Sequence, residues 1–193
     1  MKTTIKTFVV ALISLVAVNV NAADGLVLKV NNDQNLMVQI ETIENGARLT
    51  LKNKSGEILF KNVFFEEESF TKTLSFKDLA DGEYHLSLDK KFSISTWVIR
   101  KSGDQLDIDK NAYALVFKPI FKKDDKLVYF YVANPTEEKT YLEIYDKSGV
   151  LVGTSKSDKL VVKKTLDFST MPNGEYSVIV KMGNKKFTER IFI

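Results

Sequence analysis

Two stretches of the chain, LADGEY at residues 79–84 and MPNGEY at residues 171–176, are closely similar and lie 92 residues apart. Two further motifs recur around them at offsets of 93 and 92 residues: Lys-Ser-Gly at 54–56 and 147–149, and Thr-Leu-x-Phe at 73–76 and 165–168. Chance does not preserve both the order and the spacing of three motifs. The sequence therefore predicts that one folding unit occurs twice.

Each repeated stretch ends in a tyrosine directly after a tight turn that contains Gly82 or Gly174. In β-sandwiches a tyrosine at this place can bond its hydroxyl to the upstream backbone, an arrangement called a tyrosine corner. We expect Tyr84 and Tyr176 to be such structural corners. The alternative, that both tyrosines contact a ligand, is less favoured because a residue shared by both units points to a shared fold.

Hydrophobic residues alternate with polar ones throughout the chain, as in residues 36–40 and 47–51, and no long segment has helical periodicity. Alternation of this kind is typical of antiparallel sheets with one solvated face. Each unit contains about seven such segments, the number found in immunoglobulin-like sandwiches. We therefore expect an all-β protein of two tandem immunoglobulin- or fibronectin-III-like antiparallel β-sandwiches.

The first 22 residues have the features of a secretory signal peptide: basic Lys2 and Lys6, an apolar stretch over residues 8–18, and small residues before the cleavage point at Ala22. The apolar stretch is too short to span a membrane, and no later segment is apolar enough to do so. We expect the boundaries to be 1–22 for the signal peptide, 23–101 for the first sandwich, 102–112 for a polar linker and 113–193 for the second sandwich. The expected location is outside the cytoplasm, in the periplasm, at the cell surface or in the medium.

The charge of the chain excludes some partners. The whole chain carries 28 Lys and Arg against 25 Asp and Glu; without Lys2 and Lys6 the balance is 26 against 25. Up to residue 110 the expected mature chain has 12 basic and 15 acidic residues, and beyond it 14 and 10. Such weak biases argue against nucleic-acid binding. We expect a protein or cell-surface component as the partner, with a glycan as an alternative.

Residues suited to catalysis or metal binding are sparse. The chain has no cysteine and one histidine, His85, which is expected to face solvent. Zinc and copper sites need more nitrogen or sulfur ligands than these. Asp104, Asp107 and Asp109 could supply oxygen ligands to calcium, but no EF-hand spacing accompanies them. We expect no catalytic residues, no bound metal and no cofactor, and hence no enzymatic activity.

One candidate binding surface remains, at Tyr129 and Tyr131. These tyrosines alternate with Val128, Phe130 and Val132, so they share one face of a predicted strand. If the valine face is buried, the tyrosines form a flat exposed pair suited to a sugar or a protein partner. The alternative is that the tyrosines pack inside the sandwich or between the domains.

The second unit resembles the C-terminal sorting domain of the Bacteroidetes type IX secretion system. The residues that carry this resemblance are Asn134-Pro135, the hairpin at 141–152, the corner at 171–176 and the basic last strand after Lys185. The resemblance implies a bacterial protein in which the second unit is a sorting module. The sequence thus supports a secreted, non-enzymatic binding or assembly protein of two domains, and as alternatives a type IX secretion cargo or a carbohydrate-binding module.

Overall fold

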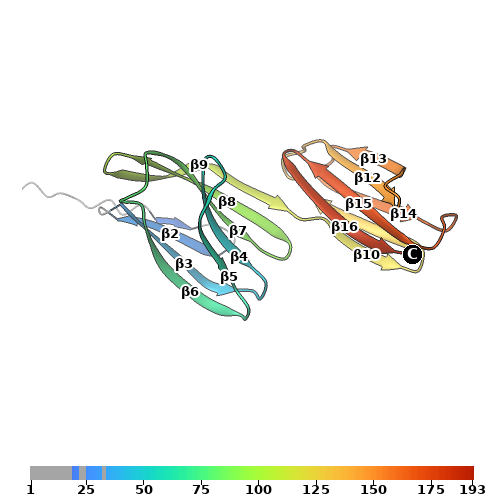
Figure 1. Ribbon diagram of the computed structural model, residues 1–193, viewed down its shortest axis with the longest axis horizontal. Helices are drawn as coiled ribbons and strands as arrows, with labels where there is room; N and C mark the ends of the chain where they lie inside the picture. The colour runs from blue at the N-terminus through green and yellow to red at the C-terminus, as the bar shows by residue number, and fades with distance from the viewer. Residues whose placement is uncertain (1–18, 22–24, 32–33) are drawn as a thin grey trace, which may run out of the picture.

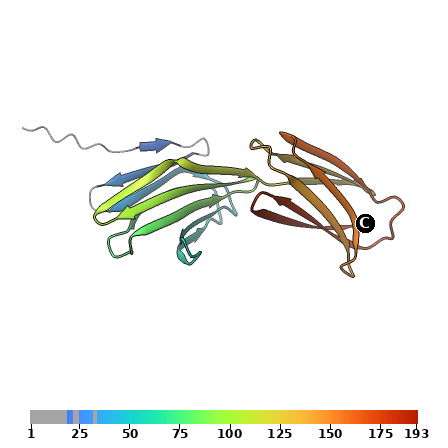
Figure 2. The ribbon, with the colours of Figure 1, turned by 90° about the horizontal axis from the view of Figure 1, so that it is seen from above.

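A computed structural model describes residues 19–21, 25–31 and 34–193, which form two antiparallel β-sandwiches arranged end to end (Figure 1 and Figure 2). The expected all-β sandwich fold is confirmed. Most of the expected signal peptide lies outside the described residues. Within these ranges, no helix is long and apolar enough to cross a membrane.

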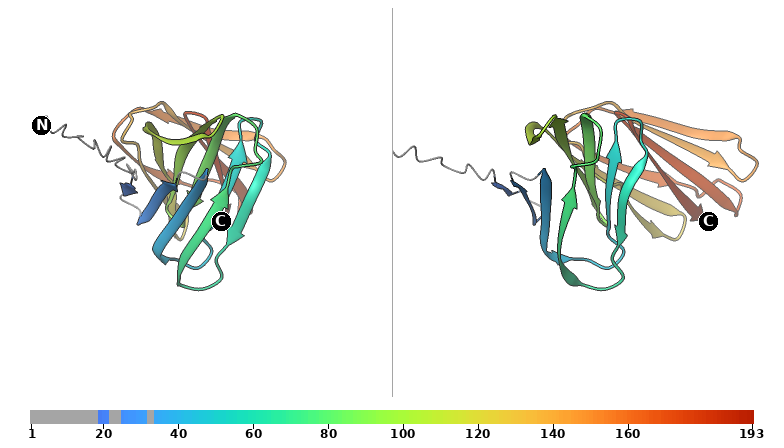
Figure 3. Two further views of the ribbon diagram at one scale, coloured as in Figure 1. Left: turned by 90° about the vertical axis from the view of Figure 1, so that its left-hand side faces the viewer. Right: turned by 60° about the vertical axis from the view of Figure 1, so that its left-hand side comes forward.

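The first sandwich packs a four-stranded sheet against a five-stranded one; it is the nearer of the two in the end-on view (Figure 3). One sheet has the order β1 (Asn19–Asn21), β2 (Leu26–Asn31), β3 (Asn35–Ile43) and β6 (Glu68–Ser75). The other has the order β5 (Ile58–Val63), β4 (Arg48–Asn53), β7 (Gly82–Asp89), β8 (Ser93–Ser102) and β9 (Gln105–Phe117). Alternate residues of both sheets meet in one buried core, which includes Leu36, Leu86 and Trp97.

The second sandwich packs three strands against four. One sheet has the order β10 (Ile120–Asp124), β11 (Leu127–Ala133) and β14 (Val161–Asp167). The other has the order β13 (Leu151–Ser157), β12 (Thr140–Asp146), β15 (Glu175–Met182) and β16 (Lys185–Phe192). Its separate core includes Phe130, Leu142 and Val178.

The two sandwiches have the same strand order once β1 and β9 are set aside. The strand register agrees as well: Leu36 lies opposite Leu74, and Val128 lies opposite Leu166, so both partners are displaced by 92 residues. In constant-type immunoglobulin domains the fourth strand joins the sheet of the first, second and fifth. Here the fourth strand of each unit, β5 or β13, pairs instead with the third strand.

Residues 102–112, which were expected to form a linker, instead lie at the end of β8, in the turn after it and in β9. Strand β9 pairs with β8 along most of its length, and Ile108 is buried in the first core. The expectation was wrong because it rested on the many charged residues of the segment. Leu106 and Ile108 alternate with Asp107 and Asp109, which is the pattern of an outer strand with one solvated face.

The junction between the sandwiches is consequently short. Phe117 still lies opposite Ser93 of β8, while its neighbour Val116 packs against the second core. The Lys118 amide donates a hydrogen bond to the Phe92 carbonyl at 2.8 Å. Only residues 118 and 119 separate β9 from β10, so the two sandwiches are joined by one short segment of the chain (Figure 2).

Candidate functional site

The two predicted corner tyrosines make equivalent contacts. The Tyr84 hydroxyl donates to the Ala80 carbonyl at 2.5 Å, and the Tyr176 hydroxyl donates to the Pro172 carbonyl at 2.7 Å. Both side chains are buried in their cores. Burial, and to a smaller extent the charge of Asp81, raises the pKa of Tyr84. Both hydroxyls are thus engaged with the turn and are not placed to contact a ligand.

The repeated motifs meet at each corner. The ring of Phe76 lies edge-on to that of Tyr84 with centroids 5.2 Å apart, and the ring of Phe168 lies 5.0 Å from that of Tyr176. Both phenylalanines belong to the repeated Thr-Leu-x-Phe motif. The backbone φ at Gly82 is +152°, in the region that favours glycine. The equivalent Gly174 does not have a positive φ. Positive φ is therefore required at the first corner alone.

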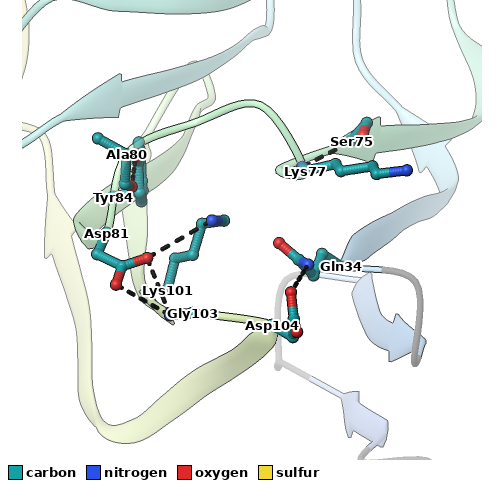
Figure 4. Close-up of polar contacts among 9 residues, drawn as sticks. All are labelled: Gln34, Ser75, Lys77, Ala80, Asp81, Tyr84, Lys101, Gly103 and Asp104. Carbon is teal, nitrogen blue, oxygen red and sulfur yellow. Dashed lines mark hydrogen bonds and ion pairs between the residues drawn. The ribbon is translucent and has the colours of Figure 1, made fainter.

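Asp81 holds the end of the additional β8–β9 hairpin in the first sandwich (Figure 4). Both of its carboxylate oxygens accept hydrogen bonds from the Gly103 amide at 2.9 Å. The ammonium of Lys101, a largely buried side chain, lies 3.5 Å from the same carboxylate. The equivalent residue in the second sandwich is Asn173. The cluster therefore anchors a hairpin.

The aspartates that were considered as calcium ligands do not come together in one site. Asp104 accepts a hydrogen bond from the Gln34 side-chain amide at 3.0 Å (Figure 4), and Asp109 forms an ion pair with Arg100 at 2.8 Å. The single histidine, His85, is partly exposed and lies 3.4 Å from Glu83. The part of the chain that the structure describes contains no group of three or more metal-ligating side chains.

The candidate pair Tyr129 and Tyr131 lies on the outer face of β11. The alternating residues Val128, Phe130 and Val132 are buried in the core, while Tyr131 is 39 % exposed and Tyr129 is half-buried. Basic residues flank the pair on the neighbouring strands, since Tyr129 lies opposite Lys122 and Tyr131 lies opposite Lys163. The first sandwich has Met37 and Gln39 at the equivalent positions, so the fold does not require this surface.

Asn134 has a structural role that the sequence motif Asn-Pro does not reveal. The side chain is fully buried, and its amide donates to the carbonyls of Glu138 at 2.8 Å and Lys159 at 3.2 Å. Its side-chain oxygen accepts from the Glu138 amide at 3.1 Å. Asn134 thus ties the loop between β11 and β12 to the loop before β14. An Asn-Pro pair indicates a turn, but the bond to Lys159 depends on the tertiary fold.

A second polar cluster lies on the outer face of the β13-β12-β15-β16 sheet. Glu143 accepts hydrogen bonds from the ammonium of Lys181 at 2.7 Å and from the hydroxyl of Tyr145 at 2.9 Å. The bond from Lys181, and next that from Tyr145, lowers the pKa of Glu143. The bond to Glu143 in turn raises the pKa of Lys181 and that of Tyr145. These shifts favour a charged Glu143 and a charged Lys181, which is the opposite of what a general acid at Glu143 would need.

Comparison with solved structures finds distant likenesses. A structure titled "Biofilm associated protein - BSP domain" aligns with 83 % of this chain at 10 % identity and a TM-score of 0.30. The human OSCAR ligand-binding domain aligns with 85 % of this chain and 92 % of its own at 12 % identity and a TM-score of 0.26. The chain spans 27 % of the length of the first of these structures.

The family comparison is more specific. No curated protein matches the chain. Residues 128–193 match the family described as the secretion system C-terminal sorting domain. The match begins in β11 and runs to the last residue, so it covers every described strand of the second sandwich except β10.

Proposed function

We propose that the protein is exported by a type IX secretion system and that its second sandwich directs this export. The match of residues 128–193 to a secretion system C-terminal sorting domain is the observation that carries the proposal. The matched residues include Asn134 and Tyr176, whose side chains bond to two turns of this sandwich. The destination is the cell surface or the medium.

The first sandwich is then the exported domain. We infer that the two sandwiches arose by duplication, because strand order and register agree at a constant displacement. In the first sandwich, β9 and the hairpin contact at Asp81 add to this shared set of strands. Its role is binding or assembly without catalysis, as expected of a compact sandwich built from short turns.

The surface of Tyr129 and Tyr131 supports a second candidate function, the binding of a glycan or a protein. Its support is the outward placement of both rings beside Lys122 and Lys163. Tyrosine combines an apolar ring with a polar hydroxyl, so it suits contact with sugars and with protein surfaces. The double change Tyr129→Ala/Tyr131→Ala tests this role, with loss of partner capture at an unchanged melting temperature as the expected result.

The sorting role is tested in a Bacteroidetes host that has a type IX system. The full chain is expected at the surface or in the medium, and a chain ending at Phe117 is expected to stay in the periplasm. A periplasmic reporter fused to residues 118–193 should be exported. A matched reporter fused to residues 25–117 should remain behind. Export of the chain ending at Phe117 would contradict the proposal.

A further inference from the structure

A row of four side chains crosses the outer face of the β13-β12-β15-β16 sheet, whose strands are labelled in Figure 1. Lys156 lies opposite Tyr141, Tyr141 lies opposite Lys181, and Lys181 lies opposite Lys186. We refer to these four residues as the Tyr141 row. The next residues along β12 and β15, Leu142 and Met182, are buried, so the row points away from the core.

Tyr141 lies beside three hollows of the surface. Its side chain is 44 % exposed although it lies on a central strand of the sheet. The volumes of these hollows are about 270, 310 and 400 Å³. The charged residues that line them are Lys139, Lys156 and Asp158 in the first, Lys156 and Glu143 in the second, and Lys139, Lys181 and Glu138 in the third. An exposed aromatic ring thus has space beside it, and both ammonium and carboxylate groups line that space.

The charges of this region are only partly balanced. Lys181 is paired with Glu143 at 2.7 Å. Lys139 and Lys156 form no ion pair with any residue that the structure describes. Lys181 also lies directly opposite Lys186, and like charges at such positions destabilise a sheet. Glu143 offsets part of this repulsion, since the hydrogen bond from Lys181 and the charges of both lysines lower its pKa, and an anion bound along the row would offset more of it.

The first sandwich provides an internal comparison. At the equivalent positions the order is Val63, Arg48, Asp89 and Ile94. There the two central residues have opposite charges, and the outer two are apolar. Because both sandwiches share strand order and register, the fold does not require three lysines and a tyrosine. Of the two sandwiches, only the second therefore has this row.

We propose that the Tyr141 row binds an anionic glycan, a sugar chain bearing carboxylate groups. The Tyr141 ring stacks on a sugar face, and the ammonium groups of Lys156 and Lys186 pair with carboxylates on either side of it. Neighbouring strands lie about 4.8 Å apart, a spacing close to the length of one sugar unit. The row therefore runs across the sheet in the direction that an extended sugar chain would follow.

A peptide is a poorer fit to this surface. Extended peptides are commonly held by adding a strand to a sheet edge, where backbone groups are free. The backbones of β12 and β15 are paired on both sides, so the middle of the row offers side chains only. The site does not depend on the export proposal, because it concerns the folded surface whatever its destination.

Binding of oligogalacturonate to the purified full chain, measured by titration calorimetry, tests the proposal. We expect saturable binding that weakens as salt is raised, because salt screens exposed charges, and no binding of neutral dextran oligomers of matched length. Tyr141→Ala should weaken binding at least about tenfold, a loss of about 1.4 kcal/mol. Lys156→Ala/Lys186→Ala should weaken binding and reduce its salt dependence.

Two control variants test whether binding occurs at the Tyr141 row. Arg48→Ala alters the equivalent position of the first sandwich, and Phe65→Ala removes an exposed aromatic ring from the first sandwich; both should bind like the unaltered chain. All variants should keep their melting temperatures, since the altered side chains are exposed. Unchanged binding by Tyr141→Ala, or equal loss in Phe65→Ala, would overturn the proposal. Equal binding of polyglutamate would overturn the glycan assignment in favour of an acidic peptide.

Discussion

The carboxylate of Asp81 accepts the amide hydrogen of Gly103, 22 residues further along the chain. This contact links the corner of the first sandwich to the hairpin that follows it. The second sandwich has Asn173 at the equivalent position. The first corner thus has a carboxylate where the second has an amide, and this carboxylate holds the turn between β8 and β9.

Replacement of Asp81 should therefore affect the first sandwich. Asp81→Ala leaves the largely buried Lys101 without its carboxylate and removes both bonds to Gly103. Because Asp81 itself is largely exposed, we expect a loss of about 1 kcal/mol in the free energy of unfolding. Faster hydrogen exchange at the Gly103 amide should accompany it. Asn173→Ala is the matched control and should change stability by less than about 0.5 kcal/mol.

The corner tyrosines give a second prediction. Tyr84→Phe and Tyr176→Phe each remove one hydroxyl that bonds to a backbone carbonyl. Each should lower the free energy of unfolding by about 0.5–1.5 kcal/mol in chemical denaturation. Tyr141→Phe serves as control because its side chain is exposed and the change should be nearly neutral. If all three changes were equally neutral, the corner bonds would not contribute to stability.

The sandwich fold could be predicted from the sequence because its determinants are local. Val128, Phe130 and Val132 alternate with Tyr129 and Tyr131, and this pattern is enough to separate the buried face from the outer face. Gly56, the turn glycine of the first Lys-Ser-Gly motif, could also be recognised from the sequence; its backbone φ is +88°.

Features that depend on distant pairing could not be predicted. Strand β9 is a different case, because its alternation of Leu106 and Ile108 with Asp107 and Asp109 is local; it was missed because the charged residues were interpreted as a linker. The Tyr141 row is invisible along the chain, since Lys156 and Lys186 are 30 positions apart and meet Tyr141 only through the sheet register. A sequence pattern determines the faces of a strand, but the neighbours of that strand depend on the whole topology.

Asn134 gives a third prediction, for the second sandwich. Asn134→Ala removes all three side-chain hydrogen bonds at a fully buried position and leaves the Glu138 amide and the Lys159 carbonyl without these partners. Unsatisfied buried groups cost about 1–3 kcal/mol each, so we expect a loss of at least about 2 kcal/mol in denaturant unfolding. Thr136→Ala, at an exposed position of the same loop, is the control and should have a much smaller effect.

The extent of the first domain gives a fourth prediction. A fragment of residues 23–117 retains β9, whereas a fragment of residues 23–103 lacks it and exposes the edge of β8. The shorter fragment also loses Ile108 from the core. We expect cooperative thermal unfolding of the longer fragment and a markedly lower melting temperature, or aggregation, of the shorter one. Equal melting temperatures would show that β9 adds nothing to the first sandwich.

The pH response of the second sandwich depends on Glu143. The Lys181 bond, followed by the Tyr145 bond, lowers the pKa of Glu143 below its ordinary value. The folded protein therefore holds this proton less tightly than the unfolded chain does. The resulting stability is present above the pKa of the unfolded chain and is lost as pH falls through the pKa of the folded protein.

Removal of the Lys181 ammonium gives the last prediction. Lys181→Met should raise the pKa of Glu143 in a carboxyl NMR titration, because the hydrogen bond that lowers it most is lost. The same change should reduce the loss of stability in acid, since less of that stability then depends on an ionised Glu143. Lys186→Met removes only a weaker charge interaction and should produce a smaller shift. Identical titration of Glu143 in the unaltered chain and in Lys181→Met would refute the assigned cause.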